Sequence, residues 1–162
     1  MALADYFLKI DGIPGESQDA KHKDEIHLES WSFGEANAGT FSHSGGGGAG
    51  KVQMQDFNFT ANISKASPLL FLRCASGEHI PKAVMVARKA GKDQQEYYKI
   101  TLSDLLISSY NIGGSGQGDV VPVDQVAMNF AKIEIEYKEQ KADGSLGAAA
   151  KAGWDLKKNV KV

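Results

Sequence analysis

The sequence predicts a mainly-β fold, a barrel of bent strands arranged as two packed sheets with one short α-helix. Hydrophobic and polar side chains alternate along much of the chain with the period of two that is typical of strands. In three places this alternation slips by one residue, as it does where a β-bulge bends a strand. Strongly bent strands favour a closed or nearly closed barrel over a flat sheet.

Composition and charge describe one globular domain spanning residues 1–162. Hydrophobic residues make up 42% of the chain and charged residues 23%, with 18 glycines against 4 prolines, which suits the turns of a β protein. The 18 basic and 20 acidic side chains give a net charge of -2. This balance argues against nucleic acid as a partner and against a polybasic membrane contact. The single cysteine, Cys74, excludes an intrachain disulfide and fits folding in a reducing compartment.

The first residues do not form a secretion signal. Residues 1–11 have no basic start, and charged side chains interrupt their apolar ones. No stretch approaches the roughly 20 apolar residues that a membrane helix needs. We therefore expect a protein made in the cytoplasm, without membrane insertion, that leaves the cell only by a route that reads no cleaved N-terminal signal.

The first half of the chain predicts three strands. Residues 5–11 alternate as one strand, and polar residues 16–25 form a loop. A second strand begins at Ile26 and continues in the opposite phase to Phe33. After a long polar loop, the third strand covers residues 51–63 and also slips, so we expect a bulge in each of these two strands.

The helix is predicted over residues 67–76. Ser67 can cap its start, and Gly77 can supply the left-handed residue after its end. Four consecutive apolar residues cover nearly every side of this helix, so more than one face must be buried. We assign these four to the subunit interface: Leu69, Leu70, Phe71 and Leu72. A helix that plugs its own barrel is the alternative.

The second half of the chain predicts long strands and one soft loop. Residues 80–89 and 95–112 read as strands, the second long enough to bend midway. Residues 125–138 form a strand that contains the third slip. Residues 139–153 predict a loop, and residues 154–160 a last strand.

The glycine-rich segment matches a nucleotide-binding motif in spacing only. Gly45 and Gly50-Lys51 have the spacing of a phosphate-binding loop, but Val52 stands where a hydroxyl should bind magnesium. A strand follows this loop, whereas phosphate binding needs a helix N-terminus. A loop that contacts another subunit is the better interpretation.

The titratable residues do not form a recognisable catalytic or metal site. Among the four histidines only His22 and His27 are close in sequence, and no third ligand is in register with them. Cys74 lies among apolar residues of the helix, where a thiol is inert. We therefore expect no catalytic, cofactor or metal site and no enzymatic activity.

Charge is uneven between the two ends of the chain. Residues 1–35 contain eight acidic side chains and three lysines, whereas residues 151–162 contain four lysines and one aspartate. Such asymmetry can guide a head-to-tail contact between copies, which closes into rings or extends into filaments. Ordinary solvated ends are the alternative.

Short motifs then identify a family. They run in order over almost the whole chain: Trp31-Ser32-Phe33-Gly34, Gly48-Ala49-Gly50-Lys51, Asp56-Phe57-Asn58-Phe59-Thr60, Ser67-Pro68-Leu69, Arg88-Lys89-Ala90-Gly91, Ile100-Thr101-Leu102, Asn129-Phe130 and Gly153-Trp154-Asp155. On these motifs the chain closely resembles the Hcp family, the haemolysin-coregulated tube proteins of type VI secretion. Phe33 and Ala61 depart from the residues that relatives often have there, and neither departure threatens the fold.

The resemblance implies an assembly as well as a fold. An Hcp-like β-barrel with one helix forms homohexameric rings with an open channel, and the rings stack into an inner tube. A contractile sheath expels this tube, the VgrG spike protein caps it, and effector proteins travel in the channel. A phage-type tail-tube protein shares this architecture, and a secreted monomeric binding module or effector is the alternative of another class.

Site residues follow from the resemblance together with strand geometry. Trp31 and Phe33 point to one face of their strand, so Ser32 points to the other. If the two aromatic residues are in the core, Ser32 lines the channel and contacts cargo. We assign the loop of residues 39–51 to ring stacking, through Gly39, Phe41, His43, Gly45, Gly46, Gly47, Gly48, Gly50 and Lys51.

Overall fold

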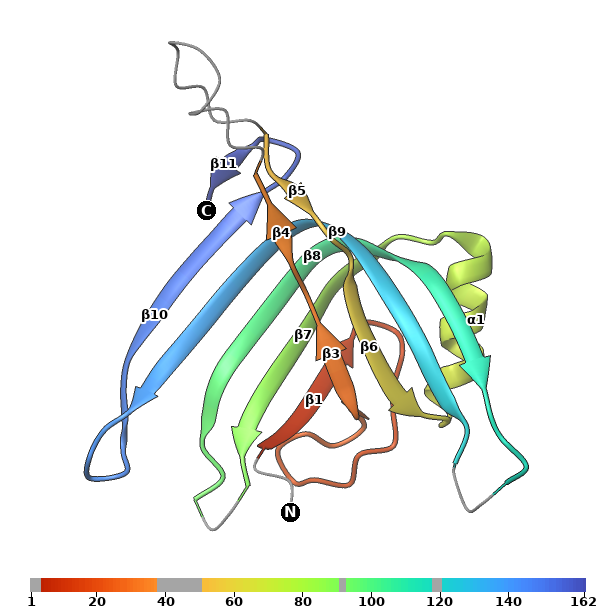
Figure 1. The fold of residues 1–162 in the computed structure, drawn as a ribbon, viewed down its shortest axis with the longest axis horizontal. Helices are drawn as coiled ribbons and strands as arrows, with labels where there is room; N and C mark the ends of the chain where they lie inside the picture. Colours follow the sequence, from red (N-terminus) through yellow and green to blue (C-terminus); the bar gives the residue numbers. More distant parts are fainter. Residues whose placement is uncertain (1–3, 38–50, 91–92, 118–120) are drawn as a thin grey trace.

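A computed structural model describes residues 4–37, 51–90, 93–117 and 121–162 (Figure 1). Strands dominate these residues, accompanied by one short helix, as the sequence predicts. In chain order the elements are β1 (Ala4–Ile10), β2 (Ile26–His27), β3 (Ser30–Ser32), β4 (Glu35–Ala36), β5 (Gln53–Met54), β6 (Phe57–Asn62), α1 (Ala66–Ser76), β7 (Ile80–Lys89), β8 (Glu96–Gly113), β9 (Val123–Gln140), β10 (Leu146–Asp155) and β11 (Val160–Lys161).

The main sheet is antiparallel and joins nine strands in the order β11-β10-β9-β8-β7-β1-β2, with β6 on β9 and β3 on β6. The short segment between β2 and β3 links its two edges. The Leu28 N–H donates to the Tyr6 carbonyl at 2.9 Å, and the next N–H, of Glu29, donates to the Thr60 carbonyl at 2.8 Å. The sheet therefore closes on itself as a barrel, while β4 and β5 pair separately as a second, two-stranded sheet.

The predicted bulges in the first half of the chain are changes of strand partner. Residues 26–27 pair with β1, whereas residues 30–32 pair with β6. Residues 51–63 likewise divide into β5, which pairs with β4, and β6, which pairs with β9. The side-chain phase slips at these points because one strand ends and another begins, so the prediction of a bulge in each is wrong.

The third slip lies inside a strand that stays continuous. β9 runs from Val123 to Gln140 and pairs with β8 along its length. Its other neighbour is β6 up to Met128 and β10 from Lys132 onwards. The phase of its buried side chains changes where β9 passes from one neighbour to the other.

The core fills the barrel between the bent strands and α1. It combines inward-facing residues of β1, β6, β7, β8 and β9 with two residues of the helix, Ala66 and Leu70. The largest side chains that are fully enclosed are Phe57, Phe59, Leu8, Ile13, Leu70, Ile80, Met85, Ile100, Leu102, Leu105, Ile107 and Met128.

The helix begins one residue earlier than predicted, and Ser67 does not cap it. Lys65 occupies the N-cap position without a side-chain hydrogen bond. The Ser67 hydroxyl instead donates to the buried carboxylate of Asp124, which also accepts a hydrogen bond from Tyr110 at 2.7 Å. Gly77 ends the helix as predicted, with a φ of 65° and its N–H on the Arg73 carbonyl at 2.9 Å.

The predicted loop over residues 139–153 is mostly the strand β10. Only the turn around Asp143-Gly144 is a loop, and Leu146–Asp155 pairs with the second half of β9. Alanine is depleted in strands, and the alternation of large apolar side chains is missing here, so the pattern hides this strand. The chain then turns after Asp155, whose carboxylate accepts the Lys158 N–H at 2.9 Å, and ends in β11.

Candidate functional site

Ser32 lies on the outer face of the barrel wall. Its neighbour Trp31 points inward, where its ring stacks on Phe57 at 6.0 Å and meets Tyr6 edge-on at 5.9 Å. Because successive side chains of a strand point to opposite faces, this packing directs the Ser32 hydroxyl outward, where it is exposed.

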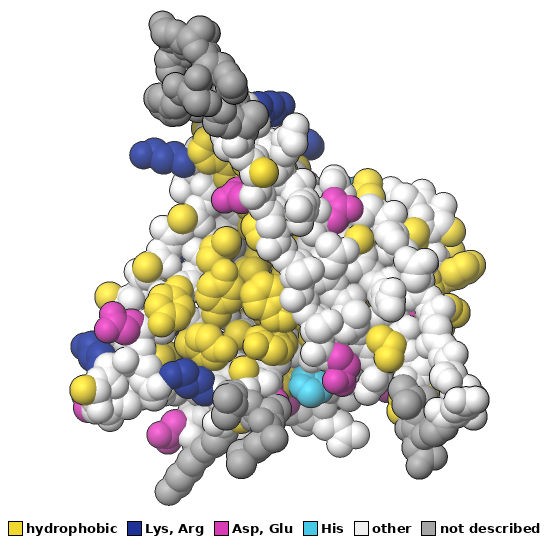
Figure 2. All heavy atoms as spheres, viewed as in Figure 1, with side chains coloured by type: hydrophobic (Ala, Val, Ile, Leu, Met, Phe, Trp, Pro, Cys, Tyr) yellow, Lys and Arg dark blue, Asp and Glu magenta, His cyan; other side chains and the backbone are white. Residues whose placement is uncertain are grey.

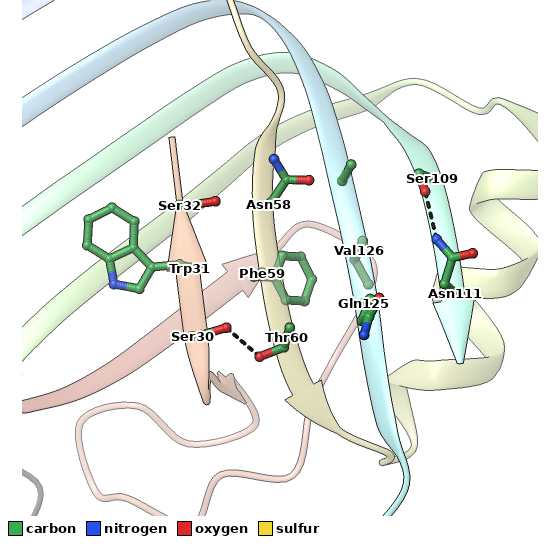
Figure 3. Close-up of a pocket in the computed structure, with 11 residues that line it drawn as sticks. Ser30, Trp31, Ser32, Asn58, Phe59, Thr60, Ser109, Asn111, Gln125 and Val126 are labelled. Atoms are coloured by element: carbon green, nitrogen blue, oxygen red, sulfur yellow. Dashed lines mark hydrogen bonds between the residues drawn. The ribbon is translucent and has the colours of Figure 1, made fainter. Parts of the chain in front are cut away.

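Strand pairing places Ser32 among other short polar side chains. β3 pairs with β6, β6 with β9 and β9 with β8, so outward residues of four strands align in rows. They line a shallow groove of about 280 Å³ (Figure 3). We call these outward residues the neutral face: Ser30, Ser32, Asn58, Thr60, Ser109, Asn111 and Gln125, with Ala127 among them.

Hydrogen bonds fix part of this face and leave part of it available. Figure 3 shows the two internal bonds, between the hydroxyls of Ser30 and Thr60 at 2.6 Å and from the Asn111 amide to the Ser109 hydroxyl at 3.1 Å. In the described residues the Ser32 hydroxyl and the Gln125 amide have no such internal partner. The face therefore offers both donors and acceptors to another molecule.

The neutral face contains no charged side chain among the described residues that form it. The carboxylate beside it belongs to Asp56, which accepts hydrogen bonds from Ser108 at 2.6 Å and from Asn129 at 2.9 Å. Its charge is therefore already solvated by neighbouring donors.

The four predicted interface residues of α1 do not share one environment. Leu70 is 1% exposed and belongs to the chain's own core, so it is not available at the surface. Leu69 is partly buried against that core. Phe71 and Leu72 are 61% and 55% exposed, and Phe71 contacts Tyr110 edge-on at 6.4 Å. The helix thus packs on its own barrel with one side and presents an apolar ridge, Phe71 and Leu72, with the other.

A second apolar surface lies on the β10 side of the molecule, away from α1. Figure 2 shows hydrophobic side chains gathered between β10 and β3, over β7, β8 and β9. We call this surface the apolar hollow. Partly buried apolar residues of these strands and of β1 are Tyr6, Trp31, Tyr98, Ile135 and Trp154.

The two ends of the molecule differ in charge. β11 and the turn before it, with Lys157, Lys158 and Lys161, lie at the same end as β4 and β5 (Figure 1). The acidic loop of residues 16–25 lies toward the opposite end. The predicted stacking residues from Gly39 to Gly50 are outside the described residues, and Lys51 is exposed.

Two buried side chains, Arg88 and His22, hold the acidic loop on the barrel, which the sequence does not reveal. The Arg88 guanidinium, 3% exposed, donates to both carboxylate oxygens of Asp19 at 2.9 and 2.8 Å and lies 4.8 Å from the centre of the Phe7 ring. This pairing holds the pKa of Asp19 well below its usual range. His22 stacks on the same ring and contacts Glu25 and Glu96.

Sequence reasoning missed most of the neutral face because it treated Ser32 alone. The signal was present in the outward positions of β6 and the first half of β9, which are uncharged at Asn58, Thr60 and Gln125. Within the described residues no three His, Cys, Asp or Glu side chains cluster as metal ligands do. That part of the chain also holds no helix with the length and hydropathy to cross a membrane.

Comparison with known proteins finds relatives over nearly the whole chain. A family model described as "Type VI secretion system effector, Hcp" matches residues 7–137. "Protein hcp1" of Pseudomonas aeruginosa is 45% identical over 158 residues, which cover 96% of this chain and 97% of that protein. The crystal structure of Hcp1 from Salmonella typhimurium is 40% identical with a TM-score of 0.85, over 99% of this chain and 100% of that one. A structure described as a type six secretion system protein is 26% identical with a TM-score of 0.92, over 98% of this chain and 99% of that one.

Proposed function

The chain belongs to the Hcp family of type VI secretion effectors, and from that premise we propose that it is a structural subunit of the type VI inner tube. Its copies form hexameric rings that stack and are expelled by the contractile sheath behind the VgrG spike. The protein acts by assembly and not by catalysis. It is made in the cytoplasm and exported by the type VI system.

The observation that carries this proposal is the pair of separate apolar surfaces. The ridge of Phe71 and Leu72 projects from α1, while the apolar hollow lies on the β10 side of the sheet. Fully burying one large apolar side chain is worth roughly 1.5–3 kcal/mol. A contact between the ridge of one copy and the hollow of the next is head-to-tail, and such contacts form rings when their rotation closes.

The same arrangement supports a channel lined by the neutral face. Ridge and hollow are occupied by neighbouring copies in such a ring, whereas the outer side of β3, β6, β9 and β8 stays uncovered. We assign this side to the channel, with Ser32 in contact with effector proteins. The lysines beside β11 and the acidic loop at the other end suit ring-to-ring stacking, together with the segment of residues 39–51.

The test is the mass in solution, measured by light scattering coupled to size exclusion at low and high salt. We expect a species of about six times the 17.4 kDa chain. A double variant, Phe71→Asp with Leu72→Asp, should be monomeric because it places two charges in the apolar contact.

The matched control is Val121→Asp, at an apolar residue that is 51% exposed in the turn between β8 and β9 and belongs to neither the ridge nor the apolar hollow, and it should keep the ring. A strictly monomeric wild type at both salt concentrations would refute the tube subunit and favour a monomeric binding module or effector. Rings that persist in the double variant would leave the tube intact but remove the ridge from its interface.

A further inference from the structure

We propose that the neutral face recognises passenger proteins by uncharged hydrogen bonds, so that passengers are selected for surfaces rich in Ser, Thr, Asn and Gln and not for their charge. This inference rests on the proposed function, because it needs the face to line the channel. It adds the chemistry of the partner to that site.

Charged side chains are absent from the outward positions of one half of a single strand, β9. Exposed positions ordinarily carry charged side chains as well as uncharged polar ones. The second half of β9 carries Lys132, Glu134, Glu136 and Lys138, whereas the exposed outward positions of its first half are Gln125 and Asn129, with Ala127 between them only 8% exposed. Solubility alone does not account for this difference, since both halves belong to the same exposed sheet.

The geometry of the neutral face also suits the binding of another molecule. Apart from Gln125 its side chains are short, and they come from four adjacent strands. Two of its hydrogen bonds already hold Ser30, Thr60, Ser109 and Asn111 in position. Short side chains lose little conformational entropy when a partner binds. They also let the partner's surface approach the sheet closely, so Ser32 and Gln125 can donate to it and accept from it.

The neutral face of one copy is small compared with a stable protein–protein interface. Four strands about 4.8 Å apart and three residues along each strand give a face of roughly 200 Å². A stable protein–protein interface takes about 800 Å² from each partner. One copy is therefore too small to hold a passenger, and several copies around one passenger supply the area and the multiplied affinity. Binding should consequently appear only in the assembled protein.

Absence of charge also sets the response to salt. Ion pairs weaken as salt rises, while hydrogen bonds between neutral groups are little affected. The carboxylate of Asp56, two residues before Asn58 of the groove, is already bonded to Ser108 and Asn129. Binding governed by Asp56 would favour basic partners and would weaken in salt, so the two cases can be distinguished.

The experiment uses three fluorescent peptides of equal length with the assembled protein. One contains only Ser, Thr, Asn and Gln, the second has lysines at regular positions, and the third has glutamates there. Fluorescence anisotropy measures each Kd at about 0.05 M and about 0.5 M NaCl. We expect the neutral peptide to bind with a Kd that changes less than about twofold, and neither charged peptide to bind more tightly.

Two variants make the test specific to the face. Asn58→Lys with Gln125→Lys should weaken the neutral peptide by at least about tenfold and create a salt-sensitive affinity for the glutamate peptide. Ala149→Lys, an exposed position of β10 away from the face, is the matched control and should change nothing.

Light scattering on the same samples separates this inference from the proposed function. A monomeric wild type overturns both. A ring that does not bind the neutral peptide, or that prefers a charged peptide with a steep salt dependence, overturns only the neutral recognition. Unchanged binding by the Asn58→Lys, Gln125→Lys variant in an intact ring places recognition elsewhere and overturns it as well.

Discussion

The two halves of β9 meet different surroundings on both of their faces. In the first half, Val126 and Met128 point into the closed core, and the opposite side carries the uncharged side chains of the neutral face. In the second half, Ile135 is only partly buried beneath the apolar hollow, and the opposite side carries lysines and glutamates. One continuous strand therefore contributes to a finished barrel at one end and to an open apolar surface at the other.

This difference shows which apolar side chains of β9 are covered within a single copy of the chain. Closure by β3 and β6 covers the inner side of the first half, so its apolar side chains are satisfied within one copy. The second half has β10 as its neighbour and no equivalent cover over Ile135 among the described residues. A second copy of the chain is the cover that we propose.

The largest expected effect contrasts a buried residue of each half. Met128→Ala should lower the free energy of unfolding by about 2–5 kcal/mol, because it leaves a cavity in a core where Met128 is fully enclosed. Ile135→Ala should cost about 1 kcal/mol, since its side chain is only partly buried. Urea unfolding measures both in the Phe71→Asp, Leu72→Asp background, where assembly does not contribute.

In a measurement of assembly, Ile135→Ala should have the larger effect and Met128→Ala the smaller one. Ile135→Ala should dissociate at higher protein concentration than wild type, whereas a folded Met128→Ala should assemble normally. Equal losses of unfolding free energy in the two variants, or unaltered assembly of Ile135→Ala, would contradict this. Either result would show that both halves of β9 are equally well packed within one copy.

The second prediction concerns the polar link between the first half and α1. Asp124 of β9 is 1% exposed and accepts hydrogen bonds from Ser67 of the helix and Tyr110 of β8. Ser67→Ala removes a donor from a buried carboxylate and should destabilise the chain by about 1–3 kcal/mol. Ser76→Ala, at the exposed end of the same helix, is the control and should cost far less.

The Tyr110 hydroxyl gives this link a signature at high pH. Burial, and the hydrogen bond to Asp124, raise the pKa of Tyr110 to about 12. The unfolded chain releases this proton near pH 10, so the folded chain binds more protons between about pH 10 and 12 and the contribution to stability falls as the pH rises through that window. Burial also raises the pKa of Tyr97 and of Tyr98, so ultraviolet titration should show more than one late-ionising tyrosine, and Tyr110→Phe should remove the component near pH 12. A variant that titrates like the wild type would contradict the link.

Local patterns predicted much of the fold and little of the site. Alternation located the long strands, and Gly77 located the end of the helix, because both depend on neighbours in sequence. β10 was not predicted as a strand because alanine has a low preference for strands. The two false bulges arose because a period-2 pattern cannot tell a bend from a change of partner.

The site was less predictable because it depends on contacts that are distant in sequence. The apolar run of α1 did not reveal that Leu70 enters the core while Phe71 stays outside, since that depends on where β8 crosses the helix. Likewise the outward direction of Ser32 was predicted from its own strand, but its neighbours Asn58 and Gln125 are set by the register of β3, β6 and β9.

The smallest expected effect tests whether the charges of the second half matter to the fold. The Glu136 side chain is 21% exposed and lies 3.8–3.9 Å from the amines of Lys99, Lys138 and Lys151, which are 46%, 40% and 69% exposed. Exposed ion pairs contribute little because water and salt screen them, so Glu136→Gln should change the free energy of unfolding by less than about 1 kcal/mol, and by less still at high salt. Urea unfolding at two salt concentrations measures this directly. A larger loss that persists in high salt would mean that the charged side of β9 is built for stability, and the contrast with the neutral face would then reflect packing demands within one chain and not two different partners.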